Sequence, residues 1–185
     1  MVSKRAFSAA VRLLLDRGFR FTVIGGTVVE LALGSRDLGP DVDVFAEEPN
    51  VLFEEEYHRV AEELGWSVGQ TWLGTPSLIA SVEGESFPIE FYDNLFDFNV
   101  PPEILERAKA VNVQGVRVRM VSVEDHIVLK ANRGLGQDMD RLKELARLAK
   151  KGRLKVDPSR LREAASYFPD EKVILRRLRD AGFPV

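Results

Sequence analysis

The 185-residue sequence predicts an α/β fold, in which a short mixed β-sheet is flanked by helices and followed by a helical C-terminal segment. Two observations carry this prediction. Short apolar stretches typical of buried strands, such as Phe21–Ile24, alternate with amphipathic stretches typical of helices, such as residues 4–17. From residue 122 onwards, the pattern is helical throughout. We therefore expect an α/β core over residues 1–121 and a helical segment over residues 122–185 that packs on it.

The residue pattern in the first half of the core predicts two strands and three helices. Ala and Leu recur at helical spacing over residues 4–17, and Gly18 follows. The strand Phe21–Ile24 leads through Gly25–Gly26 into a helix that Gly34 ends, because paired glycines allow a tight turn. The expected order is helix 4–17, strand 21–24, helix 27–33, strand 40–45, polar turn 47–50 and helix 51–64.

The remaining segments follow the same signals. Pro101–Pro102 predicts a helix start, since proline is tolerated in the first turn, and Gln114–Gly115 predicts a hairpin turn. Ser122 and Asp125 resemble a capping box, while Asp138 and Asp157 are expected to cap later helices. The expected order is strands 66–73, 77–82 and 87–92, helix 101–110, hairpin 111–120 and helices 122–132, 139–151, 158 onwards and 170–181.

The strongest chemical signal is the pair of acids in Asp41–Val42–Asp43. Alternate residues of a strand share a face, so the two carboxylates are expected to point the same way and to repel each other unless a cation lies between them. Carboxylate oxygens suit Mg²⁺ and Mn²⁺. The alternative is that both acids are solvated residues at the edge of a strand.

Glu90 lies between Ile89 and Phe91 in another apolar strand and is the expected third carboxylate. If this strand pairs with the one that carries Asp41 and Asp43, the three acids form a platform for one or two metals, as in phosphoryl and nucleotidyl transfer. Asp93 is the alternative third acid, although its odd spacing from Glu90 places the two on opposite faces of a regular strand.

The order of these pieces resembles the polymerase-β-type nucleotidyltransferase superfamily, and in particular its small AbiEii-related members. The resemblance covers roughly residues 20–148. The matching pieces are Val23–Thr27, Asp41–Asp43, Ile89–Phe91, Ser122–Lys130 and Asp138–Leu142.

The resemblance implies an enzyme that moves a nucleoside monophosphate from an NTP, with ATP the expected one, to an acceptor that is RNA, a protein or a small molecule. Asp41, Asp43 and Glu90 would be the catalytic residues and would hold Mg²⁺ or Mn²⁺, with Glu90 also the general base. Gly25, Gly26 and Thr27 would line the triphosphate, and Arg36 and Lys130 would contact phosphate. For Lys130 the alternative is a surface lysine at a helix C-terminus.

One departure from the family pattern supports a second hypothesis. Arg36 is present before the acids, but Gly39 stands where these families often place Thr or Ser, and Pro40 precedes Asp41. The alternative function is therefore a catalytically weak module with the same fold that binds RNA or a protein partner, as in toxin–antitoxin systems.

Composition narrows the class of protein. The chain has no cysteine and no apolar run of the roughly 20 residues that span a membrane, so we expect a cytoplasmic protein without thiol chemistry. His58 and His126 lack matching partners for a histidine metal site, and Trp66 and Trp72 are expected in the core.

Residues 141–185 hold 13 Lys and Arg against 6 Asp and Glu, a net charge of +7, which suits RNA or a charged partner. The alternative is that these cations only solvate helix surfaces.

Overall fold

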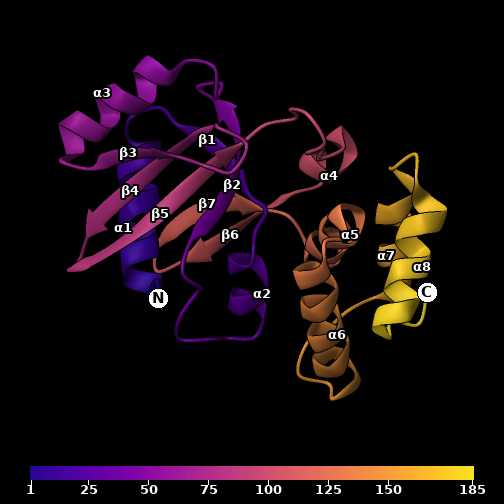
Figure 1. The fold of residues 1–185 in the computed structure, drawn as a ribbon. Helices are drawn as coiled ribbons and strands as arrows, with labels where there is room; N and C mark the ends of the chain where they lie inside the picture. Colours follow the sequence, from indigo (N-terminus) through magenta and orange to yellow (C-terminus); the bar gives the residue numbers. More distant parts are fainter. The chain divides into compact units, whose positions relative to one another are not determined.

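The computed structural model describes all residues from 1 to 185 and divides the chain into two compact units. The core unit comprises residues 1–99 and 108–120, and the helical unit comprises residues 100–107 and 121–185. Figure 1 shows the sheet and three helices of the core unit and the helices of the helical unit. The expected packing of the C-terminal helices on the α/β core stays a prediction.

A single mixed sheet forms the centre of the core unit. Its strands follow the order β3-β4-β5-β2-β1-β7-β6. β2 pairs with β5 and β1 pairs with β7 in parallel, whereas the other neighbours are antiparallel. The strands are β1 Arg20–Val23, β2 Val42–Glu48, β3 Ser67–Gln70, β4 Pro76–Val82, β5 Glu85–Tyr92, β6 Lys109–Val113 and β7 Val116–Met120.

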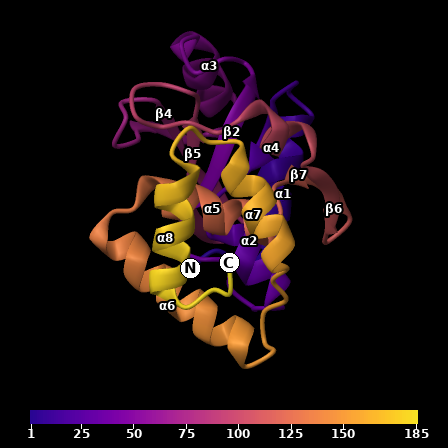
Figure 2. The same ribbon diagram turned by 90° about the vertical axis from the view of Figure 1, so that its right-hand side faces the viewer.

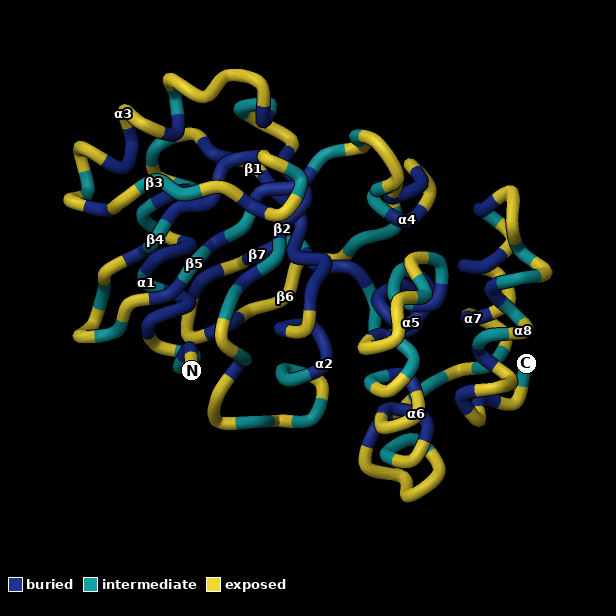
Figure 3. The backbone as a smooth tube through the Cα atoms, in the orientation of Figure 1, coloured by how far each residue is buried: buried dark blue, intermediate teal, exposed yellow.

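The two faces of β2 and β5 differ in chemistry because side chains alternate along a strand. Val42, Val44, Ile89 and Phe91 are all buried on one face. The ring of Phe91 makes edge-to-face contacts with neighbouring aromatic side chains, namely Phe19, Phe21 and Tyr57. Buried residues accordingly follow the central strands in Figure 3. This face is the hydrophobic core of the unit, so the opposite face carries the acids.

Three helices complete the core unit. α1 (Lys4–Leu15) contacts β4 and β7, and α3 (Glu54–Leu64) contacts β3 and β4. Tyr57 of α3 reaches the aromatic cluster on Phe91, which places α3 over the apolar face. The short helix α2 (Thr27–Ala32) begins directly after Gly26, as the sequence predicts.

Two of the predicted boundaries are wrong because strand pairing extends further than the local sequence indicates. Glu47 was expected in a polar turn, but β2 continues to Glu48, which pairs with Arg20 of β1. The Thr22 hydroxyl of β1 also donates a hydrogen bond to Glu47. Helix α4 (Pro102–Glu106) ends before the predicted Ala110, which instead pairs with Arg119 in the hairpin of β6 and β7.

The helical unit surrounds α5 with the other long helices. α5 (Val123–Arg133) contacts α6 (Gly136–Lys150), α7 (Pro158–Ser166) and α8 (Glu171–Ala181), and Figure 2 shows the four together. The core consists of fully buried aliphatic side chains, among them Ile127, Val128, Leu142, Leu145, Leu161, Ile174 and Leu178. The predicted capping box of Ser122 and Asp125 is confirmed. No helix in either unit is both long and apolar enough to span a membrane.

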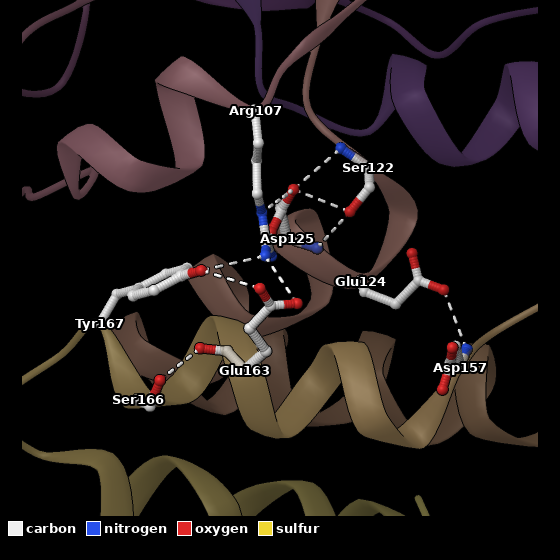
Figure 4. Close-up of polar contacts among 8 residues, drawn as sticks. All are labelled: Arg107, Ser122, Glu124, Asp125, Asp157, Glu163, Ser166 and Tyr167. Atoms are coloured by element: carbon white, nitrogen blue, oxygen red, sulfur yellow. Dashed lines mark hydrogen bonds and ion pairs between the residues drawn. The ribbon is translucent and has the colours of Figure 1, made fainter.

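A buried ion pair joins α4 to α5 in the helical unit. The Arg107 guanidinium binds the buried carboxylate of Asp125, whose Oδ2 also accepts from the Ser122 hydroxyl at 2.8 Å. Figure 4 shows that Arg107 also reaches α7, through Glu163 at 3.1 Å and the ring of Tyr167. An unpaired charge on the buried Asp125 would carry a large free-energy penalty, so Arg107 is expected to stabilise this unit.

Candidate active site

The strand register places Asp43 directly beside Glu90. β2 and β5 are parallel, and Asp43 and Glu90 are register partners, as are their neighbours Val42 and Ile89. Partners on adjacent strands lie about 4.8 Å apart and point to the same face of the sheet. Both acids are half-buried, on the face opposite the hydrophobic core. Two carboxylates from different parts of the chain therefore lie together, where a cation would be favourable.

The turn after β1 packs directly against Asp43. The Ile24 N–H donates a hydrogen bond to the Asp43 carbonyl at 3.0 Å. A Cβ built on Gly25 would lie only 2.1 Å from Oδ2 of Asp43, a distance that no real Cβ tolerates. Residue 25 must therefore be glycine for the Asp43 carboxylate to keep its position, and the reason is space, since the backbone there is not left-handed.

Asp41 lies one residue before β2 and is half-exposed. The structure contains no group of three or more His, Asp or Glu side chains that could hold a metal ion. The pair of Asp43 and Glu90 is the part of the expected platform that the strand register supports. The three-carboxylate platform with Asp41 stays a prediction.

Tyr92 adds a hydrogen-bond donor to the acid pair. Its hydroxyl donates a hydrogen bond to Oε2 of Glu90. Burial raises the pKa of Tyr92, and the hydrogen bond to Glu90 and the charges of Asp43 and Glu90 raise it further, while Trp72 lowers it. The resulting pKa of Tyr92 lies above the usual pKa of tyrosine, so the hydroxyl keeps its proton and remains a donor.

Tyr92 is not among the site residues predicted from the sequence, although one signal was present. Tyr92 follows Glu90 by two residues in β5 and so shares its face of the sheet. The expectation that Trp72 lies in the core is wrong, because the side chain is 61% exposed in the loop between β3 and β4, whereas Trp66 is buried as predicted. The indole of Trp72 lies next to the Tyr92 hydroxyl instead of within the hydrophobic core.

The other residues predicted to contact the nucleotide differ in their accessibility. Gly26 is exposed at the start of α2, and Arg36 is exposed in the loop between α2 and β2. Thr27 is buried, and its hydroxyl donates to the Leu38 carbonyl at 3.4 Å. Any contact of Thr27 with a phosphate would therefore be made by its backbone N–H.

Lys130 belongs to the helical unit and has a partner there. Its ammonium forms an ion pair with Asp138 at 2.9 Å, and Arg133 donates to the same carboxylate. Burial acts to raise the pKa of Asp138, but the hydrogen bonds from Arg133 and Lys130 outweigh burial and hold the pKa below its ordinary value. Asp138 is not the predicted N-cap of α6, because the helix begins two residues earlier, at Gly136.

Comparison with known families and structures places this geometry in context. The model of the family described as "Nucleotidyl transferase of unknown function (DUF2204)" matches residues 3–180. No curated protein matches the sequence. A nucleotidyltransferase-like protein from Paracoccidioides brasiliensis has a similar structure, with a TM-score of 0.53 and 11% identity over 97% of this chain and 88% of that one.

Two further solved structures show weaker similarity. The antibiotic-resistance factor ANT(2'')-Ia is 18% identical over 96% of this chain and 90% of that one, with a TM-score of 0.49. A CCA-adding enzyme solved with ATP is 17% identical over 96% of this chain and 46% of that one, with a TM-score of 0.42.

Proposed function

The chain belongs to the nucleotidyltransferase family DUF2204, and from this premise we propose that it transfers a nucleoside monophosphate from ATP to an acceptor hydroxyl at the Asp43–Glu90 pair. The observation that carries the proposal is the position of these two acids. The register of β2 and β5 brings the acids together, and Gly25 leaves the space that the Asp43 carboxylate occupies.

The acid pair fits a divalent cation. Mg²⁺ is usually held in proteins by one or two carboxylates together with substrate phosphates, and carboxylates also suit Mn²⁺. Asp43 and Glu90 would hold the metal, with Asp41 as a further ligand from the same segment. When bound, the metal would neutralise charge on the triphosphate and on the reacting phosphate.

The chain's own groups account for the remaining steps. Glu90 would accept the proton of the acceptor hydroxyl while the new bond to the α-phosphorus forms, the bond to the bridging oxygen breaks and pyrophosphate leaves. Gly25–Gly26 would let the phosphates approach the backbone, where the first N–H groups of a helix lack partners within it. Arg36 is exposed and would contact the phosphates, and Lys130 would do so only by leaving Asp138.

RNA is the acceptor that we favour. Five exposed cations lie at the end of α6 and in the segment that follows it, namely Arg147, Lys150, Lys151, Arg153 and Lys155. Clustered cations bind phosphate backbones and release counterions.

The backbone at Gly39 favours the second hypothesis, a weakly active binding module. Gly39 has a φ of +108°, in a conformation that Thr and Ser rarely adopt. The Val2 N–H donates to its carbonyl at 2.7 Å, so the N-terminus fixes this segment. The hydroxyl that related families often place here is therefore absent for a structural reason. A weakly active module would bind RNA or a protein without turning over ATP.

One experiment separates the two functions. Purified protein is incubated with Mn²⁺, ATP labelled at the α-phosphate and a cell extract, which is then separated into RNA, protein and small molecules. We expect metal-dependent label in the RNA fraction, and a label in another fraction would identify a different acceptor. A protein that binds RNA but gives no label in any fraction would support the binding module.

A further inference from the structure

The ring of Tyr92 is fixed at several points around Glu90. The side chain is 5% exposed, and its ring stacks on Phe98 with a centroid distance of 5.1 Å. The hydroxyl donates a hydrogen bond to Oε2 of Glu90. A side chain with this many contacts has one orientation, so the position of its hydroxyl is set by the fold.

We propose that Tyr92 is a positioning residue, which holds the Glu90 carboxylate beside Asp43. This inference rests on the proposed function, because it assigns Glu90 a role in binding metal and in accepting a proton. Neither the family description nor the motifs of the sequence point to Tyr92.

The physical reason is the repulsion between two neighbouring carboxylates. Asp43 and Glu90 are register partners, and without a cation their charges would favour rotation of the longer Glu90 side chain away from Asp43. A hydrogen bond from a neutral hydroxyl to a carboxylate opposes that rotation, because bonds to charged acceptors are stronger than neutral ones. The bond uses Oε2 and leaves Oε1 for a metal ion or an acceptor proton.

A purely structural explanation must also be considered, because a buried hydroxyl needs a partner in any protein. Tyr57 provides the matched comparison. It is fully buried in the same unit, and its hydroxyl donates to the Pro49 carbonyl at 2.9 Å instead of to an acid. Removal of either hydroxyl leaves the ring in place, so only an effect specific to Tyr92 supports a positioning role.

The test measures Mn²⁺ binding by calorimetry in the presence of a non-hydrolysable ATP analogue. Loss of a group that orients a metal ligand typically weakens metal binding by about 10- to 100-fold. We expect that loss for Tyr92→Phe and wild-type affinity for Tyr57→Phe. Equal affinity of Tyr92→Phe and wild type would overturn the inference while leaving the proposed function intact. Absence of Mn²⁺ binding by wild type would overturn both.

A spectroscopic measurement gives an independent readout. The chain has two tryptophans, so Trp66→Phe leaves Trp72 as the sole reporter. Mn²⁺ with the ATP analogue should quench Trp72 fluorescence in this variant. The Mn²⁺ concentration that gives half of the quenching should rise by at least about 10-fold when Tyr92→Phe is added. Identical titrations with and without Tyr92→Phe would contradict the positioning role.

Discussion

Gly25 and Asp43 lie so close that a Cβ on residue 25 would be 2.1 Å from Oδ2 and 2.5 Å from Cβ of Asp43. This contact joins the glycine turn after β1 to the acid of β2 that lies beside Glu90. The smallest possible side chain added at residue 25 must therefore displace the Asp43 carboxylate.

Gly25→Ala should reduce nucleotidyl transfer by about 100-fold, because a displacement of about 1 Å in a reacting group costs that much. Overpacking should also lower the free energy of unfolding by about 1–3 kcal/mol. Steady-state kinetics and urea unfolding measure the two effects. Gly26→Ala is the stability control, since a Cβ there meets no atom within 4 Å. Equal stability of both variants would show that Asp43 moves without strain.

Asp43→Asn should melt at or above the wild-type temperature in the absence of metal, because it removes a negative charge beside Glu90. It should also lose the stabilisation that Mn²⁺ and ATP give to the wild type. Thermal melting with and without these ligands tests both points. A clearly lower melting temperature of the metal-free variant would instead make Asp43 a structural hydrogen-bonding residue.

The ion pairs of Asp138 should make the stability of the helical unit dependent on pH. The pKa of Asp138 in the folded protein lies below its ordinary value of 3.8, so the charged carboxylate stabilises the fold above that pH. The stabilisation is lost as the pH falls through the lower pKa of the folded state. Asp138→Asn should therefore cost about 3 kcal/mol at neutral pH, since it leaves Lys130 and Arg133 without their carboxylate.

Urea unfolding from pH 7 down to pH 2 measures this difference between wild type and Asp138→Asn. The difference should shrink below about pH 4, where Asp138 of the unfolded chain gains a proton while Asp138 of the folded protein is still charged. A difference that stays constant over the whole range would mean that the charge of Asp138 contributes nothing.

Arg107→Ala should lower the free energy of unfolding by about 3 kcal/mol, because it leaves the buried Asp125 carboxylate without its cation. Arg141→Ala is the control from the same unit. It breaks the surface pair with Glu144, which is expected to contribute less than about 1 kcal/mol. Equal losses in the two variants would indicate that the Arg107–Asp125 pair behaves as a surface ion pair.

Replacement of Lys150, Lys151 and Arg153 by Ser should weaken RNA binding and reduce its dependence on salt. Each phosphate contact to a single strand contributes about −0.7 to the slope of log affinity against log salt. Fluorescence anisotropy across a salt series measures this slope. The control variant replaces three exposed cations of the core unit by Ser, namely Arg20, Lys109 and Arg117, and so removes the same charge. Equal slopes for the two triple variants would show that the cluster after α6 has no special role.

The sequence predicts the parts of the fold that local signals determine. The strand Arg20–Val23, the helix that follows Gly26 and the capping box at Ser122 all lie where residue patterns indicate. Long-range pairing decides the remainder. The length of β2 depends on its partner β1, and the end of α4 depends on the hairpin of β6 and β7.

In the candidate site, too, local signals predict some features and long-range pairing decides the others. Asp43 and Glu90 are recognisable as acids in apolar strands, but their direct register is a property of the folded sheet. The period of two places Tyr92 and Glu90 on one face of β5, but the hydrogen bond between them depends on how the Tyr92 ring packs in the folded protein. Lys130 has the residue type of a phosphate ligand, yet its ion pair with Asp138 depends on how α5 and α6 pack.

In the proposed function, the Asp43–Glu90 pair catalyses transfer of the nucleoside monophosphate. The most direct measurement compares ATP labelled at the α-phosphate with ATP labelled at the γ-phosphate, using wild type, Asp43→Asn and Glu90→Gln with the acceptor fraction. We expect wild type to transfer only the α-label, in a metal-dependent reaction, and both variants to lose at least about 100-fold in rate. Transfer of the γ-label, or full activity in both variants, would contradict the proposed role of the acid pair.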